Sequence, residues 1–437
     1  MDPKRPRAVP RSRFARAAGL GSLATGIAGS AALGAAGSML RGERPDRRAL
    51  LLTPGNVNRL TRELARMRGA AMKLGQLLSM ENSDLLPPDL ARVLARLRDD
   101  AHHMPPRQLK QVLMAEYGPD ALKRFRQFDP RPRAAASIGQ VHRVTAADGR
   151  DLALKIQYPG IAQAIRADVA NLGTLLRASG LLPKTLDLAP LLAEATAQLE
   201  EEADYALEAT RLVRFHDLLQ DDPAFVVPRP HPDLSTPRIL AMDFIESHPI
   251  DTLEDAEQAQ RDTALTRLFT LFLRELFHWR LVQTDPNFAN YRLTPDGSRI
   301  VLLDFGATRA FTPQSTARFR ALLDATHRGD PDALRLALTD TGFITDTTPA
   351  DQVNTILDMA ALIRPVLTSG APFDFGDTTL LNTLRRMGEH LTLTQGYAEV
   401  PHMDALHLQR KLAGLVLLAT RMRARVPLGT LLDDHLP

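Results

Sequence analysis

The chain has 437 residues, of which 44% are hydrophobic and 24% are charged. This length supports one large two-lobed core or two to three domains, and it excludes a small module that needs disulfides to fold. No cysteine occurs, so thiolate chemistry is excluded and a metal ion would need oxygen or imidazole ligands. The net charge of +3 is too small to indicate a nucleic-acid-binding protein, and we predict no nucleic-acid partner.

The first 50 residues differ in composition from the rest. Basic residues gather before position 17, and no acidic residue lies between Asp2 and Glu43. Residues 17–40 are uncharged, and small side chains recur at every fourth position from Ser22 to Ser38. Such a stripe lets a second helix approach closely, which favours membrane association and a homodimer contact. A flexible or transit-like leader is the alternative.

A helical extension is predicted to follow, over residues 51–128. Apolar residues spaced by three and four predict an amphipathic helix over residues 56–79. Near its end, Lys73-Leu74-Gly75-Gln76 places a glycine where a helix former is expected, at a cost of about 1 kcal/mol. Paired prolines precede two further predicted helices, over residues 89–97 and 107–117.

The spacing of hydrophobic residues then changes to the alternation typical of β-strands, which predicts a β-hairpin. Residues 137–144 and 152–156 are the predicted strands, and residues 147–150 form the turn. Lys155 lies on the second strand, where the lysine of a protein kinase pairs with the α- and β-phosphates. The preceding turn would cover the nucleotide, but alanines replace the usual glycines, so a positive φ is costly there. Its predicted cofactor-binding residues are Ala134, Ala135, Ala136, Ser137, Ile138, Gly139 and Gln140.

Residues 158–219 are predicted to be helical, with breaks at Gly180, Pro183 and Pro190. A strand lysine placed over phosphates needs a helix glutamate to orient it. The acidic run over residues 199–208 is the only such helix before the next strand, and we predict Glu208 for this role. Glu202 and Asp204 are available for a second cation.

An apolar strand is predicted over residues 238–245, which is the next element expected if the chain follows the order of elements in a protein kinase. There it would run into the segment that contacts adenine, which predicts nucleotide contacts at Met242, Asp243 and Phe244. A long helix over residues 262–279 then leads into a polar loop.

That loop has the spacing of a kinase catalytic loop. Asp285 and Asn290 are five positions apart, and an apolar strand later ends in Asp304-Phe305-Gly306. We predict that Asp285 orients the attacking hydroxyl or water, and that Asn290 and Asp304 hold Mg²⁺ against the phosphates of ATP (or ADP). Gln283 replaces the usual histidine, and no Ala-Pro-Glu segment follows, so peptide recognition is not expected. The remainder is predicted to be helical, and its longest apolar run, residues 412–420, is too short to span a bilayer.

Together these motifs resemble the UbiB family of atypical protein-kinase-like proteins, which is linked to coenzyme Q (ubiquinone) biosynthesis. They run in the family's order over about residues 55–310. The resemblance rests on residues 67–76, 134–142, 155–160, 202–205, 283–287 and 303–309. It implies an α+β, two-lobed atypical protein-kinase-like fold with an N-terminal helical extension, and the mitochondrial-type branch, because the C-terminal transmembrane helices of many bacterial relatives are absent.

The resemblance also implies how the site is regulated. The Lys-x-Gly-Gln motif, here Lys73 to Gln76, reaches the active site near Glu202 and Asp204 and occludes the groove where a peptide would lie. In that family the alanine turn is tied to an altered nucleotide preference, so the resemblance implies ATP hydrolysis in place of protein kinase activity.

We therefore predict a membrane-associated, Mg-ATP-dependent ATPase or small-molecule kinase that supports ubiquinone biosynthesis. The predicted parts are residues 1–50, 51–128, 129–246 (N-lobe) and 247–437 (C-lobe). Expected partners are a membrane lipid or quinone-like molecule and quinone biosynthesis proteins, at the cytoplasmic face of a bacterial inner membrane or the matrix side of the mitochondrial inner membrane. The alternatives are a nucleotide-gated, non-catalytic scaffold of a quinone biosynthesis complex and a protein kinase.

Overall fold

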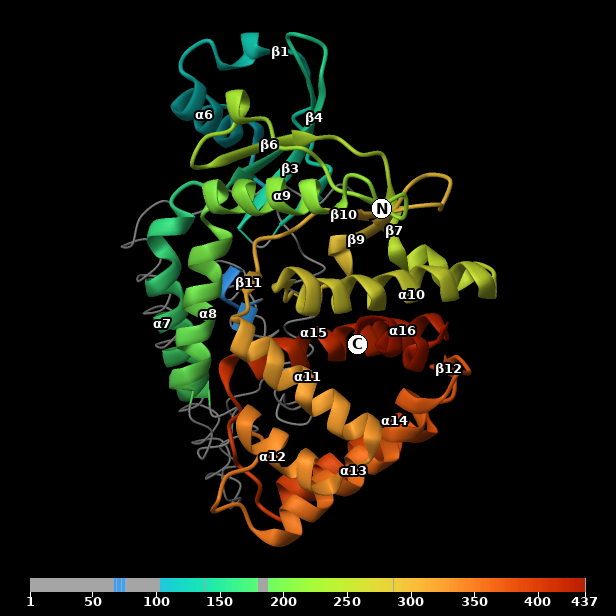
Figure 1. Ribbon diagram of the computed structural model, residues 1–437. Helices are drawn as coiled ribbons and strands as arrows, with labels where there is room; N and C mark the ends of the chain where they lie inside the picture. The colour runs from blue at the N-terminus through green and yellow to red at the C-terminus, as the bar shows by residue number, and fades with distance from the viewer. Residues whose placement is uncertain are drawn as a thin grey trace, which may run out of the picture. The chain divides into compact units, whose positions relative to one another are not determined.

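The computed structural model describes residues 67, 69–71, 73–74, 103–136, 138–179, 188–285 and 287–436 (Figure 1). Contacts divide the chain into two compact units. The first contains the described residues up to Arg214 together with Pro228–Phe244, and the second contains Phe215–Val227 and the chain from Ile245 onwards. The predicted basic arm, the small-residue stripe and most of the helical extension lie outside the described residues, and the predicted domain boundaries stay a prediction.

The first unit is built on an antiparallel sheet of five strands in the order β1-β3-β4-β6, with β2 paired to β3. Its strands are β1 (Phe125–Phe128), β2 (Ala134–Ala135), β3 (Gly139–Ala146), β4 (Asp151–Gln157) and β6 (Ile239–Asp243). The predicted hairpin is confirmed as β3 and β4, which join through a turn where Gly149 has a φ of +99°. On β4, Lys155 lies opposite Val141 of β3 and Leu240 of β6, so it occupies an interior strand.

Helices make up most of the rest of the first unit (Figure 1). They are α6 (Pro106–Tyr117), η1 (Ala121–Arg124), α7 (Ile161–Ser179), α8 (Ala189–Glu202), α9 (Tyr205–Leu219), which continues into the second unit, and η2 (Pro232–Leu234). The predicted interruption at Pro190 corresponds to the start of α8, since Leu188 is not helical and this proline lies in the first turn of the helix. A proline is tolerated there because the first N–H groups of a helix have no partner within it.

A large hydrophobic cluster fills the described part of the first unit. It joins the described part of the extension to the sheet, since Leu74, Met104 and Leu154 are all buried members of the same cluster. Strand β4 is buried along nearly its whole length, as expected for an interior strand covered on both faces. The core therefore holds the segment of Lys73 and the strand of Lys155 in one compact body.

The second unit is mainly helical. Its helices are α10 (Gln258–Leu273), the π-helix η4 (Arg274–Trp279), α11 (Pro313–Arg328), α12 (Pro331–Thr341), α13 (Ala350–Thr368), α14 (Thr379–Glu389), η6 (His390–Thr394), α15 (Met403–Met422) and α16 (Leu428–His435), with short turns η3 (Ile250–Asp255) and η5 (Phe288–Asn290). The long helix predicted before the catalytic loop is confirmed as α10 and η4. In the described part of the chain, no helix has both the length and the apolar character needed to cross a membrane.

Short strands in the second unit frame the predicted catalytic segment. One sheet has the order β5-β10-β9-β7 and another pairs β11 with β8. The strands are β5 (Phe225–Val226), β7 (His248–Pro249), β8 (Leu281–Gln283), β9 (Tyr291–Leu293), β10 (Ile300–Leu302) and β11 (Thr308–Ala310), and a third pair is β12 (Phe373–Asp374) with β13 (Arg425–Val426). The loop from β8 to β9 thus joins two different sheets.

Candidate active site

Lys155 and Glu208 form a buried ion pair in the first unit. Helix α9 begins at Tyr205, which places Glu208 in its first turn. The Lys155 Nζ atom lies 2.6 Å from Glu208 Oε1 and 2.9 Å from Oε2. Glu208 is 2% exposed and Lys155 is 8% exposed, so the pair is held largely away from water. The structure therefore brings together the predicted phosphate-binding lysine and the glutamate predicted to orient it.

A second ion pair links the extension to the end of α8. Lys73 is 2% exposed, and its Nζ atom lies 2.6 Å from Glu202 Oε1. Asp204 has a different role, because its Oδ1 atom accepts a hydrogen bond from the Leu207 N–H and caps the start of α9. Of the predicted regulatory residues, Lys73 and Glu202 are thus in contact, Asp204 is a helix cap, and Gln76 lies outside the described residues.

The alanine turn is a tight hairpin between β2 and β3. The Ala136 N–H donates to the Gly139 carbonyl at 2.8 Å, and Ala134 and Ala135 are exposed. None of these alanines has a positive φ, and the expected limit on how their backbone covers phosphates stays a prediction. Gly139 is required by close packing, since a Cβ there would lie 2.5 Å from the Ile156 carbonyl oxygen. Ser137 lies outside the described residues.

Gln140 and Ile138 of the same turn point into the protein. Ile138 is 1% exposed within the hydrophobic cluster. The Gln140 Oε1 atom accepts from the Met104 N–H at 2.8 Å, and its Nε2 atom donates to His142 Nε2 at 2.7 Å. Burial lowers the pKa of His142, which suits a neutral ring that accepts this hydrogen bond. Gln140 is 0% exposed and lies between Ala135 of β2 and Ile156 of β4, so its predicted contact with a nucleotide stays a prediction.

The predicted adenine segment lies at the end of β6, where the chain leaves the first unit after Phe244. Met242 is 5% exposed and pairs with Ala153 on β4. The guanidinium of Arg143 lies 4.1 Å from the centre of the Phe244 ring. These side chains serve internal packing, and the N–H groups of Asp243 and Phe244 donate to main-chain carbonyls at 3.0 Å, so the adenine contact stays a prediction.

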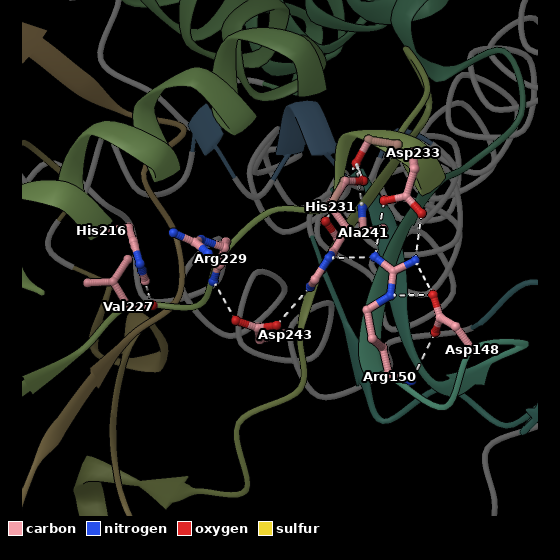
Figure 2. A network of polar contacts seen from close by, with 10 residues as sticks. Asp148, Arg150, His216, Val227, Arg229, His231, Asp233, Ala241 and Asp243 are labelled. Carbon is pink, nitrogen blue, oxygen red and sulfur yellow. Dashed lines mark hydrogen bonds and ion pairs between the residues drawn. The ribbon is translucent and has the colours of Figure 1, made fainter.

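Asp243 belongs to a polar network within the first unit (Figure 2). His231 Nε2 donates to Asp243 Oδ1 at 2.7 Å, and the Arg229 N–H donates to Oδ2 at 2.9 Å. Arg150 continues the network, donating to His231 Nδ1 at 2.8 Å and pairing with Asp233 at 2.6 Å. The turn between β3 and β4 is thereby tied to the last residue of β6.

The catalytic loop of the second unit brings Asp285 and Asn290 together. Asn290 Nδ2 donates to Asp285 Oδ2 at 3.4 Å, and the Asn287 N–H donates to Oδ1 at 3.3 Å. The Asn287 side chain caps η5 by accepting from the Ala289 N–H at 3.1 Å. Because the amide nitrogen of Asn290 serves this hydrogen bond, its amide oxygen is the atom suited to a cation.

The Asp-Phe-Gly segment is anchored beside that loop. Asp304 Oδ1 accepts from the Gly306 N–H at 2.9 Å, and the Leu303 N–H donates to the Asn290 carbonyl at 3.3 Å. Phe305 is 2% exposed and stacks on Phe215 with ring centres 4.3 Å apart. The carboxylate of Asp304 and the amide of Asn290 are thus held on adjoining segments of one unit.

This donor set suits magnesium. Mg²⁺ prefers hard oxygen ligands and is usually held by one or two protein groups together with phosphates and water. Asp304 and Asn290 offer such oxygens, whereas no group of three His, Asp or Glu side chains that could hold a metal occurs in the described residues. The residues present therefore fit an ion that arrives with a nucleotide.

Sequence reasoning missed a buried polar cluster behind the loop. Lys411 on α15 is 3% exposed, and its Nζ atom donates to Gln283 Oε1 at 2.9 Å and to the Tyr291 hydroxyl at 2.7 Å. Glu275 lies 3.9 Å from the same nitrogen, and burial raises its pKa to about 7. Arg410 contacts Asp285 itself at 3.7 Å. A sequence signal existed, since Lys411 lies at helical spacing among the apolar residues of α15.

Comparison with known proteins identifies the chain. Residues 96–337 match the family model described as the ABC1 atypical kinase-like domain. The chain belongs to this family. The predicted resemblance to UbiB-type atypical kinases is confirmed, and so is the α+β kinase-like fold.

Relatives of this ABC1 protein match along nearly its whole length. Atypical kinase COQ8, mitochondrial, of Saccharomyces cerevisiae is 37% identical and covers 98% of this chain and 85% of its own. Atypical kinase COQ8B, mitochondrial, of Rattus norvegicus is 36% identical and covers 99% and 82%. Among solved structures, Rv3197 of Mycobacterium tuberculosis, in complex with erythromycin, is 26% identical with a TM-score of 0.60, over 87% of this chain and 95% of its own.

Proposed function

We propose that this ABC1 protein is a Mg-ATP-dependent phosphoryl-transfer enzyme that acts as an ATPase or small-molecule kinase. The observation that carries the proposal is the buried pair of Lys155 and Glu208, whose Nζ and Oε1 atoms are 2.6 Å apart. An ammonium held at this strand position by a helix carboxylate is what a kinase uses to orient α- and β-phosphates. The Asp285 and Asn290 contact in the second unit supports the same chemistry.

Each residue has a role set by its charge. Lys155 donates to phosphate oxygens, and Glu208 keeps its ammonium in place. Asp285, oriented by the amide of Asn290, accepts the proton of the attacking hydroxyl or water. The oxygens of Asn290 and Asp304 hold Mg²⁺, which neutralises phosphate charge when it is bound.

The acceptor is proposed to be water or a small molecule. Lys73, which pairs with Glu202, takes the regulatory role that the family resemblance implies and keeps a peptide away from the site. The absence of an Ala-Pro-Glu segment after Gly306 supports this choice over a protein kinase.

The proposed biological role is support of ubiquinone biosynthesis at the membrane that contains the quinone. The similarity to proteins named COQ8 supports this role. Its partners would be a membrane lipid or quinone-like molecule and other quinone biosynthesis proteins. The location would be the cytoplasmic face of a bacterial inner membrane or, as for the relatives named mitochondrial, the matrix side of the mitochondrial inner membrane.

The Asp285→Asn variant tests the chemistry. Removal of the proton acceptor is expected to lower ATP hydrolysis by at least about 100-fold, since general base catalysis typically contributes about 10² to 10⁴. ATP binding, measured by calorimetry, should change little because Lys155 and Asp304 are intact. The control is Glu200→Gln, which removes an exposed carboxylate paired with Arg166 and should leave hydrolysis unchanged. Undiminished hydrolysis in Asp285→Asn would reject the assignment.

Quinone profiling separates the enzyme from the scaffold alternative. A strain that lacks the gene would be complemented with the wild type or with Asp285→Asn. Loss of quinone with the variant supports an enzyme, whereas full recovery with a variant that binds but does not hydrolyse ATP supports the scaffold.

A further inference from the structure

One buried lysine joins the two ends of the catalytic loop. Gln283 is the last residue of β8, two positions before Asp285, and Tyr291 is the first residue of β9, directly after Asn290. The Lys411 Nζ atom donates to the Gln283 side chain at 2.9 Å and to the Tyr291 hydroxyl at 2.7 Å. A single ammonium therefore bridges the residues that flank the proposed base and metal ligand.

Strand pairing within the sheets does not by itself set the distance between the two ends of the loop, at Gln283 and Tyr291. Strand β8 pairs with β11, whereas β9 pairs with β10 and β7 in a separate sheet. The loop that carries Asp285 and Asn290 thus spans two sheets. Lys411 connects them from a helix more than 100 residues later in the chain.

Helix α15 meets the loop at two neighbouring positions. Lys411 holds its ends, and Arg410 lies 3.7 Å from Asp285. Both side chains are at least nine-tenths buried, at 3% and 9% exposed, so solvent screens these contacts little. The helix therefore supports the proposed base directly as well as through the loop ends.

Glu275 offsets the charge of Lys411. It lies in the π-helix that precedes the loop, is 1% exposed, and has its Oε2 atom 3.9 Å from the Lys411 ammonium. Its carboxylate also accepts a hydrogen bond from the Gln283 main chain. Short π-helical segments are frequent at functional sites, and this one places a carboxylate next to the loop. Gln283 is thus held by Lys411 through its side chain and by Glu275 through its main chain.

Burying the ion pair of Lys411 and Glu275 costs free energy, so it is an inefficient way to stabilise the fold. Ions removed from water lose hydration, and hydrophobic residues of similar volume often stabilise a core as well or better. The presence of a lysine at this position is better explained by the geometry that it imposes on the loop. A displacement of about 1 Å at a catalytic group can lower a rate by about 100-fold.

We propose that Lys411 is a positioning residue that fixes the distance between Gln283 and Tyr291, and thereby the relative placement of Asp285 and Asn290. The inference rests on the proposed phosphoryl-transfer function. Lys411 acts through the loop and does not touch the nucleotide.

The test is steady-state ATP hydrolysis by Lys411→Met, which keeps the length of the side chain and removes its donors and charge. We expect kcat to fall by at least about tenfold, with the KM for ATP within about twofold of the wild type. The Mg²⁺ concentration for half-maximal rate should rise, because Asn290 is no longer held. Lys411→Arg, which can reach the same acceptors, should recover part of kcat.

A second variant separates positioning from stability. Lys411→Met combined with Glu275→Gln leaves no unpaired charge in the core and is expected to melt close to the wild type while its kcat stays low. Recovery of both melting temperature and kcat in this double variant would show a purely structural role and overturn the proposal. The same conclusion follows if Lys411→Met folds and keeps the wild-type kcat and Mg²⁺ requirement.

Different results would reject the proposed function and the proposed role of Lys411. If the wild type binds ATP but does not hydrolyse it, the proposed function is wrong and the role of Lys411 falls with it. If the wild type hydrolyses ATP and the Lys411 variants do so equally well, only the role of Lys411 is rejected.

Discussion

At the scale of single residues, three lysines are buried beside carboxylates. Lys73, Lys155 and Lys411 are each at most 8% exposed. A buried ammonium is costly unless it is paired, and groups in such environments concentrate at functional sites. Two of the pairs are hydrogen-bonded at 2.6 Å, whereas the third is 3.9 Å apart. Their partners are Glu202, Glu208 and Glu275.

Truncation of Glu208 tests the cost of leaving Lys155 alone. Glu208→Ala is expected to lower the free energy of unfolding by about 3 to 5 kcal/mol, because a buried charge then has lost its partner. Combined replacement with Lys155→Met and Glu208→Leu should recover most of this loss of stability. Neither Glu208→Ala nor the double variant is expected to bind ATP. Urea denaturation and calorimetric titration with ATP measure the two quantities. Full ATP affinity in the double variant would contradict the role of Lys155.

At the scale of elements, the β2–β3 hairpin contains one residue needed for packing of the sheet and another that limits the backbone conformation. Gly139 lies where β3 and β4 approach closely, and a Cβ there would lie 2.5 Å from the Ile156 carbonyl oxygen. Ala135, on the facing strand, is exposed. The glycine therefore serves packing of the sheet, whereas the alanine limits the conformations of the backbone that would cover a nucleotide.

The two positions are expected to respond differently to substitution. Gly139→Ala should cost about 1 to 3 kcal/mol of stability through overpacking. Ala135→Gly should cost less than about 1 kcal/mol and should change nucleotide affinity, because the backbone gains conformations that allow a closer approach to phosphates. Urea unfolding and parallel ATP and ADP titrations measure both effects. Equal stability losses with unchanged affinities would contradict this division of roles.

At the scale of the whole molecule, the described residues form two units, each with buried clusters of its own. The proposed phosphate-binding pair of Lys155 and Glu208 belongs to the first unit. The proposed base and metal ligands belong to the second. Each unit thus contains a distinct part of the proposed set of residues.

Membrane association is a prediction about the chain as a whole. The uncharged stretch of residues 17–40, preceded by a basic arm, is expected to bind vesicles that contain anionic lipid. A variant without residues 1–50 should float with such vesicles several-fold less than the full chain, and 0.5 M salt, roughly three times physiological ionic strength, should weaken the part of binding due to the basic arm. Equal flotation of both proteins would reject this role for the N-terminal segment.

The sequence alone determined the features that depend on local order. The β3–β4 hairpin follows from a period of two interrupted by a turn, and the long helix before the catalytic loop follows from a period of three to four. The spacing of Asp285, Asn290 and Asp304 was likewise visible, because a loop and the strand after it keep these residues close along the chain.

Only the tertiary structure decided which buried polar groups meet. Lys411 contacts Gln283 across 128 positions, and Gln140 contacts the Met104 main chain across 36. Periodicity shows which face of a helix or strand is buried, but the partner of a buried donor depends on how distant elements pack. For this reason the motif residues could be predicted from the sequence, whereas the lysine that bridges the two ends of their loop could not.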